Sequence, residues 1–431
     1  MLKRMFLYAV FLMMLVPSTV LASGFAINEQ GAKALGMGGA FAAQADDPTA
    51  VYYNPAGITQ LEGTQFSIGA AVITPSVSFE SDGTTTVPGA YAGEDTTTED
   101  RIFIVPNMYI THKVSDRFSI GLGSFTNFGL GTDWPDNWEG SFLIGGTNAE
   151  IKTYTLNPVV ALEASDKLSL SFGFFYQQVD VNLESRLAPI MHPVLGELHR
   201  ETDLIFNTES GEYGYNVGLL YEVNKNWKVG FSHRSSVKHT TKGDVKTSDN
   251  ELIPALGARP YDAYNTDVTA DLTLPAVTYL GTAYTRDKLT VEFDIQFTEW
   301  SSYDQLESVE VGLSKDKDWN DALALRLGGQ YSFNEMFDLR LGLVRDYSPV
   351  PDETVDPMLP SGDRWLYTIG AGLNFGDLGI DLAYNYLQDE ARDYDNQAGD
   401  FEYPAGVPQH MEGTYKDNYA HIFAVNVKYK F

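Results

Sequence analysis

Residues 421–431, the last eleven of this 431-residue chain, read HIFAVNVKYKF. Every second side chain from Phe423 to Phe431 is apolar or aromatic, and most side chains between them, including Lys428 and Lys430, are polar. In an extended strand the two sets lie on opposite faces, as expected where lipid covers one face and water the other. Chain ends of soluble proteins usually fray, whereas the last strand of a closed barrel pairs with the first. We therefore predict an all-β chain that forms a bacterial outer-membrane barrel.

The N-terminus has the pattern of a secretory signal peptide. Lys3 and Arg4 form a positive segment, an apolar core follows at residues 5–16, and Val20-Leu21-Ala22 precedes a cleavage site near Ser23. The apolar core is shorter than the roughly 20 residues that a helix needs to span a bilayer, which disfavours the alternative of an N-terminal anchor. We expect residues 1–22 to be removed on export.

The composition excludes several classes of protein. The chain has no cysteine, so zinc-finger, iron–sulfur and thiol chemistry are not expected, and no cofactor is predicted. A formal net charge of −29 argues against nucleic-acid binding, which relies on Lys and Arg contacts to phosphate. Aromatic residues make up 13% of the chain, which argues against disorder and suits aromatic girdles at two membrane interfaces.

The body of the chain alternates between short polar turns and much longer polar connections. Turns such as Asp116-Arg117, Asp166-Lys167 and Asp287-Lys288 each precede an alternating strand. Short turns at one rim and long loops at the other are typical of a transmembrane barrel, and an even strand number closes an antiparallel sheet. We predict about fourteen strands, near residues 64–74, 102–113, 117–125, 150–164, 167–183, 212–223, 227–239, 268–285, 287–302, 321–333, 337–346, 364–376, 378–388 and 419–431.

Residues 23–62 do not alternate, and they are rich in glycine and alanine. Short helices and turns with small side chains could pack closely against a barrel wall from inside. Such a wide barrel has a lumen that its own side chains cannot fill. We therefore predict an N-terminal hatch, or plug, at 23–62 and the barrel at 63–431. The alternative is a loose periplasmic tail.

Ordered motifs along the mature chain resemble the FadL/TodX family of outer-membrane transporters for long-chain fatty acids and aromatic hydrocarbons. The resemblance is collinear and covers essentially the whole mature chain. It rests on Ser23–Glu29, Asp46-Asp47, Asn54–Thr59, Val105–Met108, Asn127–Thr132, Asp321-Ala322, Arg326–Gly328, Asp346–Pro351 and Asp363–Trp365.

The resemblance implies passive uptake of a hydrophobic compound. Extracellular loops would capture the substrate, a tighter site in the barrel would receive it, and movement of the hatch would release it sideways through the wall at a kinked strand. Leaving each CH₂ in water costs about 0.8 kcal/mol, so a lateral exit into lipid avoids a penalty that an aqueous pore would impose. Long-chain fatty acids are the expected substrates, with aromatic hydrocarbons as the alternative.

Two short segments are candidates for gating. Phe128, Gly129 and Leu130 lie where the third strand ends, and a glycine within a strand favours a bulge or bend. By resemblance this is the kink that opens the wall, and an ordinary loop start is the alternative. By the same resemblance Asn54, Pro55 and Ala56 attach the hatch to the barrel and the kink, and a simple turn is the alternative. Phe25 belongs to the hatch motif.

Arg186 and Lys315 fall near positions where the fatty-acid transporters carry cations that bind a carboxylate. Lys315 aligns through the Asp318–Asp321 segment that follows it, and Arg186 needs a shift of one residue. A guanidinium and an ammonium inside a low-dielectric lumen would hold a carboxylate head group. The alternative is a pair of surface charges neutralised by Glu184 and Asp316.

Apolar side chains in two long loops are candidates for a capture groove. Exposed apolar patches often mark binding sites, and self-packing of the loops is the alternative. The predicted groove residues are Trp134, Trp138, Phe142, Leu187, Ile190, Met191 and Leu195.

Enzyme signatures such as HExxH, GxSxG and the P-loop are absent from the sequence, so no catalytic or metal site is predicted. A general porin would lack the hatch, and a surface adhesin would use the acidic loops instead. Outer-membrane lipid and lipopolysaccharide are the expected partners, with divalent cations as possible bridges to the acidic loops. We expect a monomer.

Overall fold

The structure, a computed structural model, describes residues 24–83, 94–187, 190–192, 196–199, 202–247, 265–311, 313–396 and 411–431. The predicted signal peptide at 1–22 lies outside these ranges.

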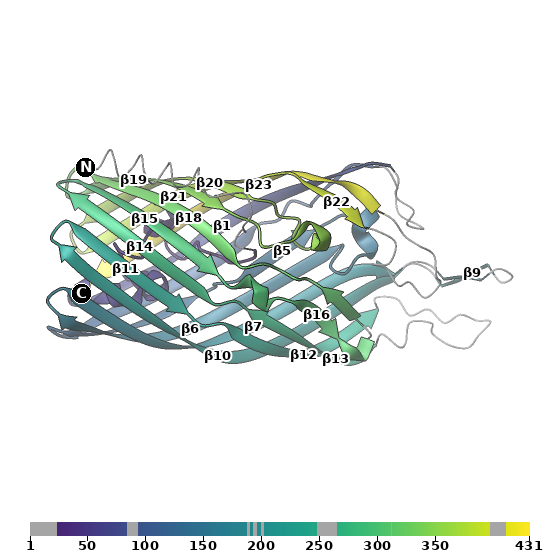
Figure 1. Cartoon of the computed structure of the whole chain (residues 1–431), viewed down its shortest axis with the longest axis horizontal. Helices are drawn as coiled ribbons and strands as arrows, with labels where there is room; N and C mark the ends of the chain where they lie inside the picture. Colours follow the sequence, from purple (N-terminus) through teal and green to yellow (C-terminus); the bar gives the residue numbers. More distant parts are fainter. Residues whose placement is uncertain are drawn as a thin grey trace.

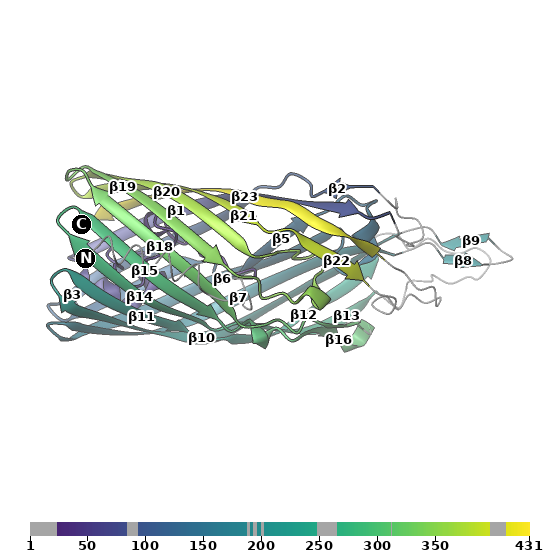
Figure 2. The ribbon, with the colours of Figure 1, turned by 45° about the horizontal axis from the view of Figure 1, so that its top comes forward.

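Fourteen antiparallel strands form a closed barrel within the described part of the chain. Figures 1 and 2 show the strands tilted against the long axis, with short turns at one end and the long loops at the other. The wall is built from β1 (Thr64–Ser81), β3 (Phe103–Ser115), β4 (Phe118–Phe125) continued by β5 (Gly129–Asp133), β6 (Asn148–Ser165), β7 (Leu168–Leu187), β10 (Thr202–Asn224), β11 (Trp227–Arg234) continued by β12 (Val237–Thr247), β14 (Val277–Arg286) continuing β13 (Thr266–Leu274), β15 (Leu289–Thr298), β18 (Ala322–Ser332), β19 (Phe337–Asp346), β20 (Arg364–Phe375), β21 (Leu378–Asp389) continued by β22 (Arg392–Asn396), and β23 (Met411–Lys430).

The last strand closes the barrel, as its alternation predicts. β23 pairs with β1 from Gln65↔Lys430 onward, and the Phe431 amide donates to the Thr64 carbonyl at 2.9 Å. Phe423 and the alternate residues after it point outward, with Phe423 56% exposed, whereas Ile422 and the residues in phase with it face inward. The C-terminus accordingly lies at the short-turn end of the barrel (Figure 1).

Several strands extend further toward the long loops than predicted. β1 continues to Ser81, β10 begins at Thr202, and β23 begins at Met411. Alternation marks a strand only where one face meets lipid and the other meets the lumen. Beyond the membrane both faces can meet water, so the pattern fades although the hydrogen-bonded ladder continues. The predicted boundaries are therefore wrong at these ends.

Short elements complete the fold. No helix among the described residues is long and apolar enough to cross a membrane. The hatch contains α2 (Ala32–Leu35), α3 (Ala50–Tyr53) and η1 (Pro55–Gln60). The connections contain β2 (Thr96–Thr97), η2 (Glu139–Phe142), β8 (Ile190–His192), β9 (Gly196–His199), η4 (Trp300–Ser302), β16 (Gln305–Ser308), η5 (Val309–Val311), β17 (Leu313–Asp316) and η6 (Asp352–Thr354).

Residues 24–62 fold inside the short-turn half of the barrel, where both views show the purple segment (Figures 1 and 2). Phe41 and Ile58 are fully buried and belong to one apolar cluster with Tyr109 and Val159 of the wall. Small residues permit this close packing. At Gly218 of β10, a Cβ would lie 2.4 Å from a hatch side-chain oxygen, so no larger residue fits without displacing the hatch.

Two carboxylates of β15 hold one turn of the hatch. The amides of Phe41 and Ala42 donate to Asp294 at 2.8 and 2.9 Å, and those of the next two residues donate to Glu292 at 2.6 and 2.9 Å. Both carboxylates are fully buried. Hydrogen bonds of this kind are worth about 0.5–1.5 kcal/mol each, so the four together make this contact a major attachment of the hatch.

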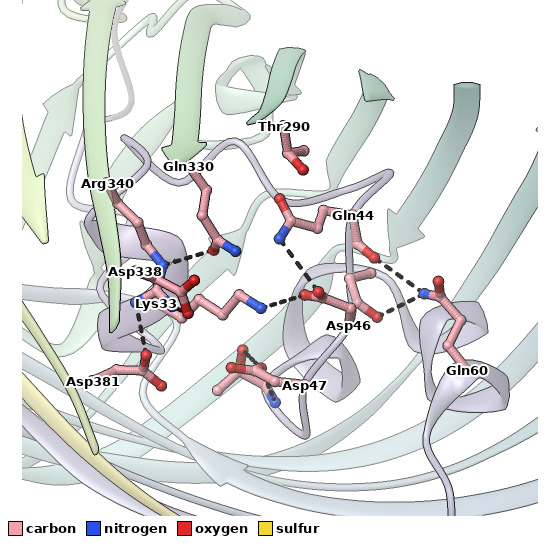
Figure 3. A network of polar contacts seen from close by, with 12 residues as sticks. Lys33, Gln44, Asp46, Asp47, Gln60, Thr290, Gln330, Asp338, Arg340 and Asp381 are labelled. Atoms are coloured by element: carbon pink, nitrogen blue, oxygen red, sulfur yellow. Dashed lines mark hydrogen bonds and ion pairs between the residues drawn. The ribbon is translucent and has the colours of Figure 1, made fainter. Parts of the chain in front are cut away.

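Ion pairs attach a second part of the hatch (Figure 3). Lys33 pairs with Asp46 at 2.7 Å within the hatch, and Arg340 pairs with Asp381 at 2.7 Å in the wall. Lys428 of the last strand connects the wall to the hatch, because its ammonium lies 2.6 Å from Asp381 of the wall and 3.5 Å from Asp47 of the hatch. The inner face of β23 thus holds the hatch while its outer face meets lipid.

Candidate functional site

The wall bends between β4 and β5. Across this bend the N-terminal segment of the hatch takes the place of a neighbouring strand: Ile27 donates to the Asn127 carbonyl at 3.0 Å, and Gly129 donates to the Phe25 carbonyl at 2.9 Å. Ala26 and Phe128 form the bridge between these bonds. The predicted kink residues therefore pair with the hatch.

The same bend leaves a gap in the wall. β3 pairs with β4 only from Met108 to Ser115, and β5 pairs with β6. Within the described ladders, residues 103–107 of β3 have no pairing to residues 129–133 of β5. Side chains cover most of this part of the wall, and one backbone hydrogen bond, from the Glu99 amide to the Asp133 carbonyl at 2.7 Å, joins its loop end. The Phe103 ring lies against Gly131, where a Cβ would be 2.2 Å from the ring.

A cavity of about 440 Å³ lies behind the gap, and we call it the wall cavity. Leu130 and Gly131 of β5 and Phe103 of β3 line it, together with Ile422 of the last strand. Ligand pockets typically measure about 300–1,000 Å³. The wall cavity is therefore large enough to hold a small hydrophobic molecule next to the gap.

A second cavity of about 50 Å³, the inner cavity, lies toward the long loops. Most of its lining is apolar, including Leu183, Phe206 and Val268. This volume is well below the roughly 300 Å³ of ordinary ligand sites, so side chains must move before a ligand enters. Four residues line both cavities: Phe25, Leu130, Ile151 and Leu359.

Phe25 is the one hatch residue among the four that line both cavities. Its ring is 4% exposed and packs edge-on against Trp300 at 4.6 Å and Trp319 at 5.8 Å between ring centres. It also contacts Phe128 of the bend at 6.2 Å.

A charged cluster lies at the lining of the inner cavity. Lys317 is almost fully buried and pairs with Asp356, and Lys315 lies 4.0 Å from the same carboxylate. Burial alone would raise the pKa of the Asp356 carboxyl, but the charges of Lys317 and Lys315 lower it below its ordinary value. Lys315 and Lys317 therefore both interact with the Asp356 carboxylate.

The other predicted cation, Arg186, lies apart from this cluster. It is at the extracellular end of β7, with its Nε 3.6 Å from Asp203 and an Nη 3.5 Å from Asn137. It lines neither the wall cavity nor the inner cavity. The structure therefore does not bring Arg186 and Lys315 together at one cavity.

Lys317 is the residue that sequence reasoning missed. The hairpin of β16 and β17 brings Lys315 opposite Leu306, and Lys317 follows with its amide bonded to the Asp304 carbonyl. The Lys-x-Lys spacing before Trp319 was the available signal. Side chains two residues apart point to the same face of a strand, so the spacing does not distinguish the two lysines. The packing of the hairpin decides which of them turns inward.

The predicted capture aromatics are buried. Trp134 and Trp138 stack at 4.3 Å, are 1% and 4% exposed, and donate to the carbonyls of Pro357 and Gly146. Phe142 is 7% exposed. Leu195 lies outside the described residues, as do the side chains of Leu187, Ile190 and Met191. The loop aromatics close the extracellular end here, and a capture role for them stays a prediction.

The Asn54-Pro55-Ala56 turn attaches the hatch to the wall at β10. The Asn54 amide donates to the Leu219 carbonyl at 3.0 Å and to the Ala42 carbonyl at 2.7 Å, and its oxygen accepts from the Ala56 amide at 3.2 Å. The wall contact of this turn, at Leu219, is therefore with β10 and not with the bend at 126–128. In the described residues, no group of three or more His, Asp and Glu side chains is placed to hold a metal ion.

Comparison with known proteins identifies relatives along the whole chain. The family described as "Outer membrane protein transport protein (OMPP1/FadL/TodX)" matches residues 13–431. The long-chain fatty acid transport protein of Escherichia coli O6:H1 is 28% identical over 451 residues, which cover 97% of this chain and 96% of the relative. Its counterpart in Salmonella typhi is 26% identical over 400 residues, covering 86% and 88%.

Solved structures share the fold. A Pseudomonas aeruginosa FadL homologue has a TM-score of 0.81 and 19% identity, and the alignment covers 95% of this chain and 100% of the other. The toluene transporter TbuX of Ralstonia pickettii has a TM-score of 0.64 and 18% identity, with 96% and 99% covered.

Proposed function

Because this chain belongs to the OMPP1/FadL/TodX family of outer membrane transport proteins, which are not enzymes, we propose that it takes up long-chain fatty acids through the wall of its barrel. The observation that carries the proposal is the pair of cavities that both have Phe25 in their lining, one beside the charged cluster and the other behind the gap in the wall. Substrate would pass from the inner cavity to the wall cavity when Phe25 moves, and leave between β3 and β5.

The lateral direction has a physical reason. The hatch fills the lumen at the short-turn end, and four of its amides are bonded to buried carboxylates there. The gap at β3 and β5 has no ladder: side chains such as Phe103 and one backbone hydrogen bond, from the Glu99 amide to the Asp133 carbonyl, cover it, and these can move at lower cost than a ladder of hydrogen bonds. An apolar chain that leaves there enters lipid without crossing water.

The charged cluster supports an acid as the substrate. Lys317, which shares the Asp356 carboxylate with Lys315, lines an apolar cavity. A carboxylate could accept a hydrogen bond from the Lys317 ammonium, and its alkyl chain would lie among Leu183, Phe206 and similar side chains. The long-chain fatty acid transport proteins among the relatives support the same assignment.

A neutral aromatic hydrocarbon is the second candidate. The rings around Phe25, including Trp300, Tyr303 and Trp319, favour it, because aromatic ligands pack well edge-on against such rings.

Mass spectrometry of compounds that co-purify with the detergent-extracted protein tests the proposal. We expect fatty acids from the wild type and far less from the Lys317→Met variant. Neutral hydrocarbons recovered equally from both proteins would instead identify a hydrocarbon transporter and leave the lysines as structural charges.

Changing Lys317 to methionine should weaken binding of oleate while sparing methyl oleate. The variant would keep only Lys315 beside Asp356, and the loss of a charge-assisted contact corresponds to about a tenfold weaker Kd or more. Fluorescence displacement on the purified protein measures both ligands. Equal losses for acid and ester would contradict a carboxylate site.

Charge restoration provides the matched control. The Lys317→Met variant combined with Asp356→Asn removes the anion that lies 4.0 Å from Lys315, so oleate affinity should recover in part relative to Lys317→Met alone. Arg186→Ala in the same assay measures how much the other predicted cation contributes to oleate affinity. Since Arg186 contacts Asp203 and Asn137 and lines neither cavity, we expect a smaller loss than for Lys317.

A further inference from the structure

A row of buried polar side chains connects the bend at 126–128 to a distant strand. Asn127 accepts at its Oδ1 from the Gln177 amide of β7 at 2.9 Å and from the Thr155 hydroxyl of β6 at 2.6 Å. The Gln177 Oε1 lies 3.1 Å from Nε2 of His239 on β12. All four side chains are at most 4% exposed. Polar groups at this depth are retained only where their hydrogen bonds are satisfied.

The donors and acceptors of this row have a single consistent direction. Since the Asn127 oxygen only accepts, Gln177 must present its NH₂ to it and its own oxygen to His239. His239 then donates from Nε2. Its Nδ1 has no hydrogen-bond partner among the described residues. Without His239 the Gln177 oxygen would lose its donor, and without Gln177 the Asn127 oxygen would keep only the Thr155 hydroxyl among the described donors.

The row joins two interruptions of the wall. At the first, Asn127 lies between β4 and β5, where the ladder to β3 ends. At the second, β10 pairs with β11 up to Arg234 and with β12 only from Lys242, so residues 237–241 pair with β13 alone in the described ladders. His239 lies in this segment. Where ladder bonds are missing, side-chain contacts decide the position of the strand.

Backbone contacts of the bend point inward. Phe128 donates its amide to the Thr153 hydroxyl at 3.0 Å and accepts from the same hydroxyl at 2.7 Å, while the Asn127 carbonyl accepts from Ile27. The Asn127 side chain is drawn toward β6 and β7 by the row. All of these contacts are with β6, β7 or the hatch, and none of them is with β3.

We propose that Gln177 and His239 are positioning residues for lateral exit, because through Asn127 they hold the bend away from β3 and so determine how wide a molecule can leave. This inference rests on the proposed function. Neither residue lines the wall cavity or the inner cavity, so neither contacts substrate there. Loss of the row would let the bend relax toward β3 and obstruct wide substrates before slim ones.

Uptake of two probes of different width tests the proposal. The full chain is reconstituted in liposomes, and uptake is measured for oleate and for a pyrene-labelled dodecanoic acid. In Gln177→Met, which keeps the side-chain length, we expect the pyrene-to-oleate uptake ratio to fall by about tenfold, as for one lost buried hydrogen-bond partner. Binding of both acids in detergent should stay near wild type, because neither Gln177 nor His239 lines a cavity.

Variants at His239 provide the second, independent measurement. His239→Phe should lower the ratio like Gln177→Met, whereas His239→Gln should retain it, since a glutamine amide can still donate to Gln177. Asn385→Leu is the matched control for a buried amide elsewhere, because neither amide atom of Asn385 has a hydrogen-bond partner in the described chain. It should leave the ratio unchanged.

The possible outcomes test the positioning role of Gln177 and His239 separately from the proposed function. A wild-type ratio in folded Gln177→Met or His239→Phe overturns the positioning role, and so does equal behaviour of His239→Phe and His239→Gln. Heat-modifiable migration on a gel verifies that each barrel is folded. Should Gln177→Met fail to fold, the comparison of His239→Phe with His239→Gln tests the positioning role. Failure of the wild type to take up either acid would refute the proposed function itself.

Discussion

Gly129→Leu is expected to stop uptake while leaving ligand binding intact. Gly129 lies in β5 at the gap, and a Cβ there would be 2.5 Å from Cδ1 of Ile27 and 3.5 Å from the Ile151 carbonyl. The Ile27 contact is with the flexible end of a side chain, so the fold can accommodate it. The added side chain then occupies the mouth of the wall cavity. Overfilling such a space costs about 1–3 kcal/mol, which predicts a roughly tenfold to hundredfold slower uptake.

The measurement compares uptake by reconstituted protein with oleate binding in detergent. Gly329→Leu is the matched control, because the nearest atom to a Cβ at Gly329 is a backbone oxygen at 3.8 Å and the residue lines neither cavity. Normal uptake in folded Gly129→Leu would show that substrate does not leave between β3 and β5. Loss of uptake in both leucine variants would make the effect nonspecific.

Deletion of residues 24–62 should convert the barrel into an open pore. The wall ladder begins at Thr64 and closes on β23 without hatch residues, so the strands can pair in their absence. The lumen of a fourteen-stranded barrel is wider than its own side chains can fill, and water would enter. Single-channel recording in a planar bilayer should show a large, steady conductance in place of a small or absent one.

A full-length variant provides the milder form of this test. Glu292→Ala combined with Asp294→Ala removes the acceptors of four hatch amides, and each lost hydrogen bond is worth about 0.5–1.5 kcal/mol. We expect frequent transient openings, fewer than in the deletion variant. A conductance unchanged from wild type in both proteins would contradict the assignment of 24–62 as the plug.

Much of the wall was predictable because its signal is local. Period-two alternation depends only on whether neighbouring side chains meet lipid or the lumen, so each strand can be recognised from about ten residues. The strand number, the antiparallel order and the pairing of the last strand with the first are all found in the structure. Boundaries failed where strands leave the membrane, as at Ser81 and Met411, since both faces can then meet water.

The candidate site was less predictable because its members are distant in sequence. Trp134 reads as an exposed capture residue until Pro357, 223 positions later, accepts its indole proton. Which of Lys315 and Lys317 is buried against a carboxylate depends on Asp356, which a different loop supplies. Arg186 reads as a lumen cation until its contacts with Asp203 and Asn137 are known.

By itself, the sequence determined a membrane barrel with an N-terminal hatch and a glycine-marked bend. Contact with lipid or water and the backbone freedom of glycine are local properties, so each can be read from a short stretch of sequence. Only the tertiary structure decided which lysine faces the inner cavity, where Asn54 attaches the hatch, and that Asn127 is held by Gln177 and His239. Those contacts join strands and loops that meet only after the barrel has closed. Their hydrogen bonds and ion pairs need positions accurate to a fraction of an ångström, which no spacing along the chain specifies.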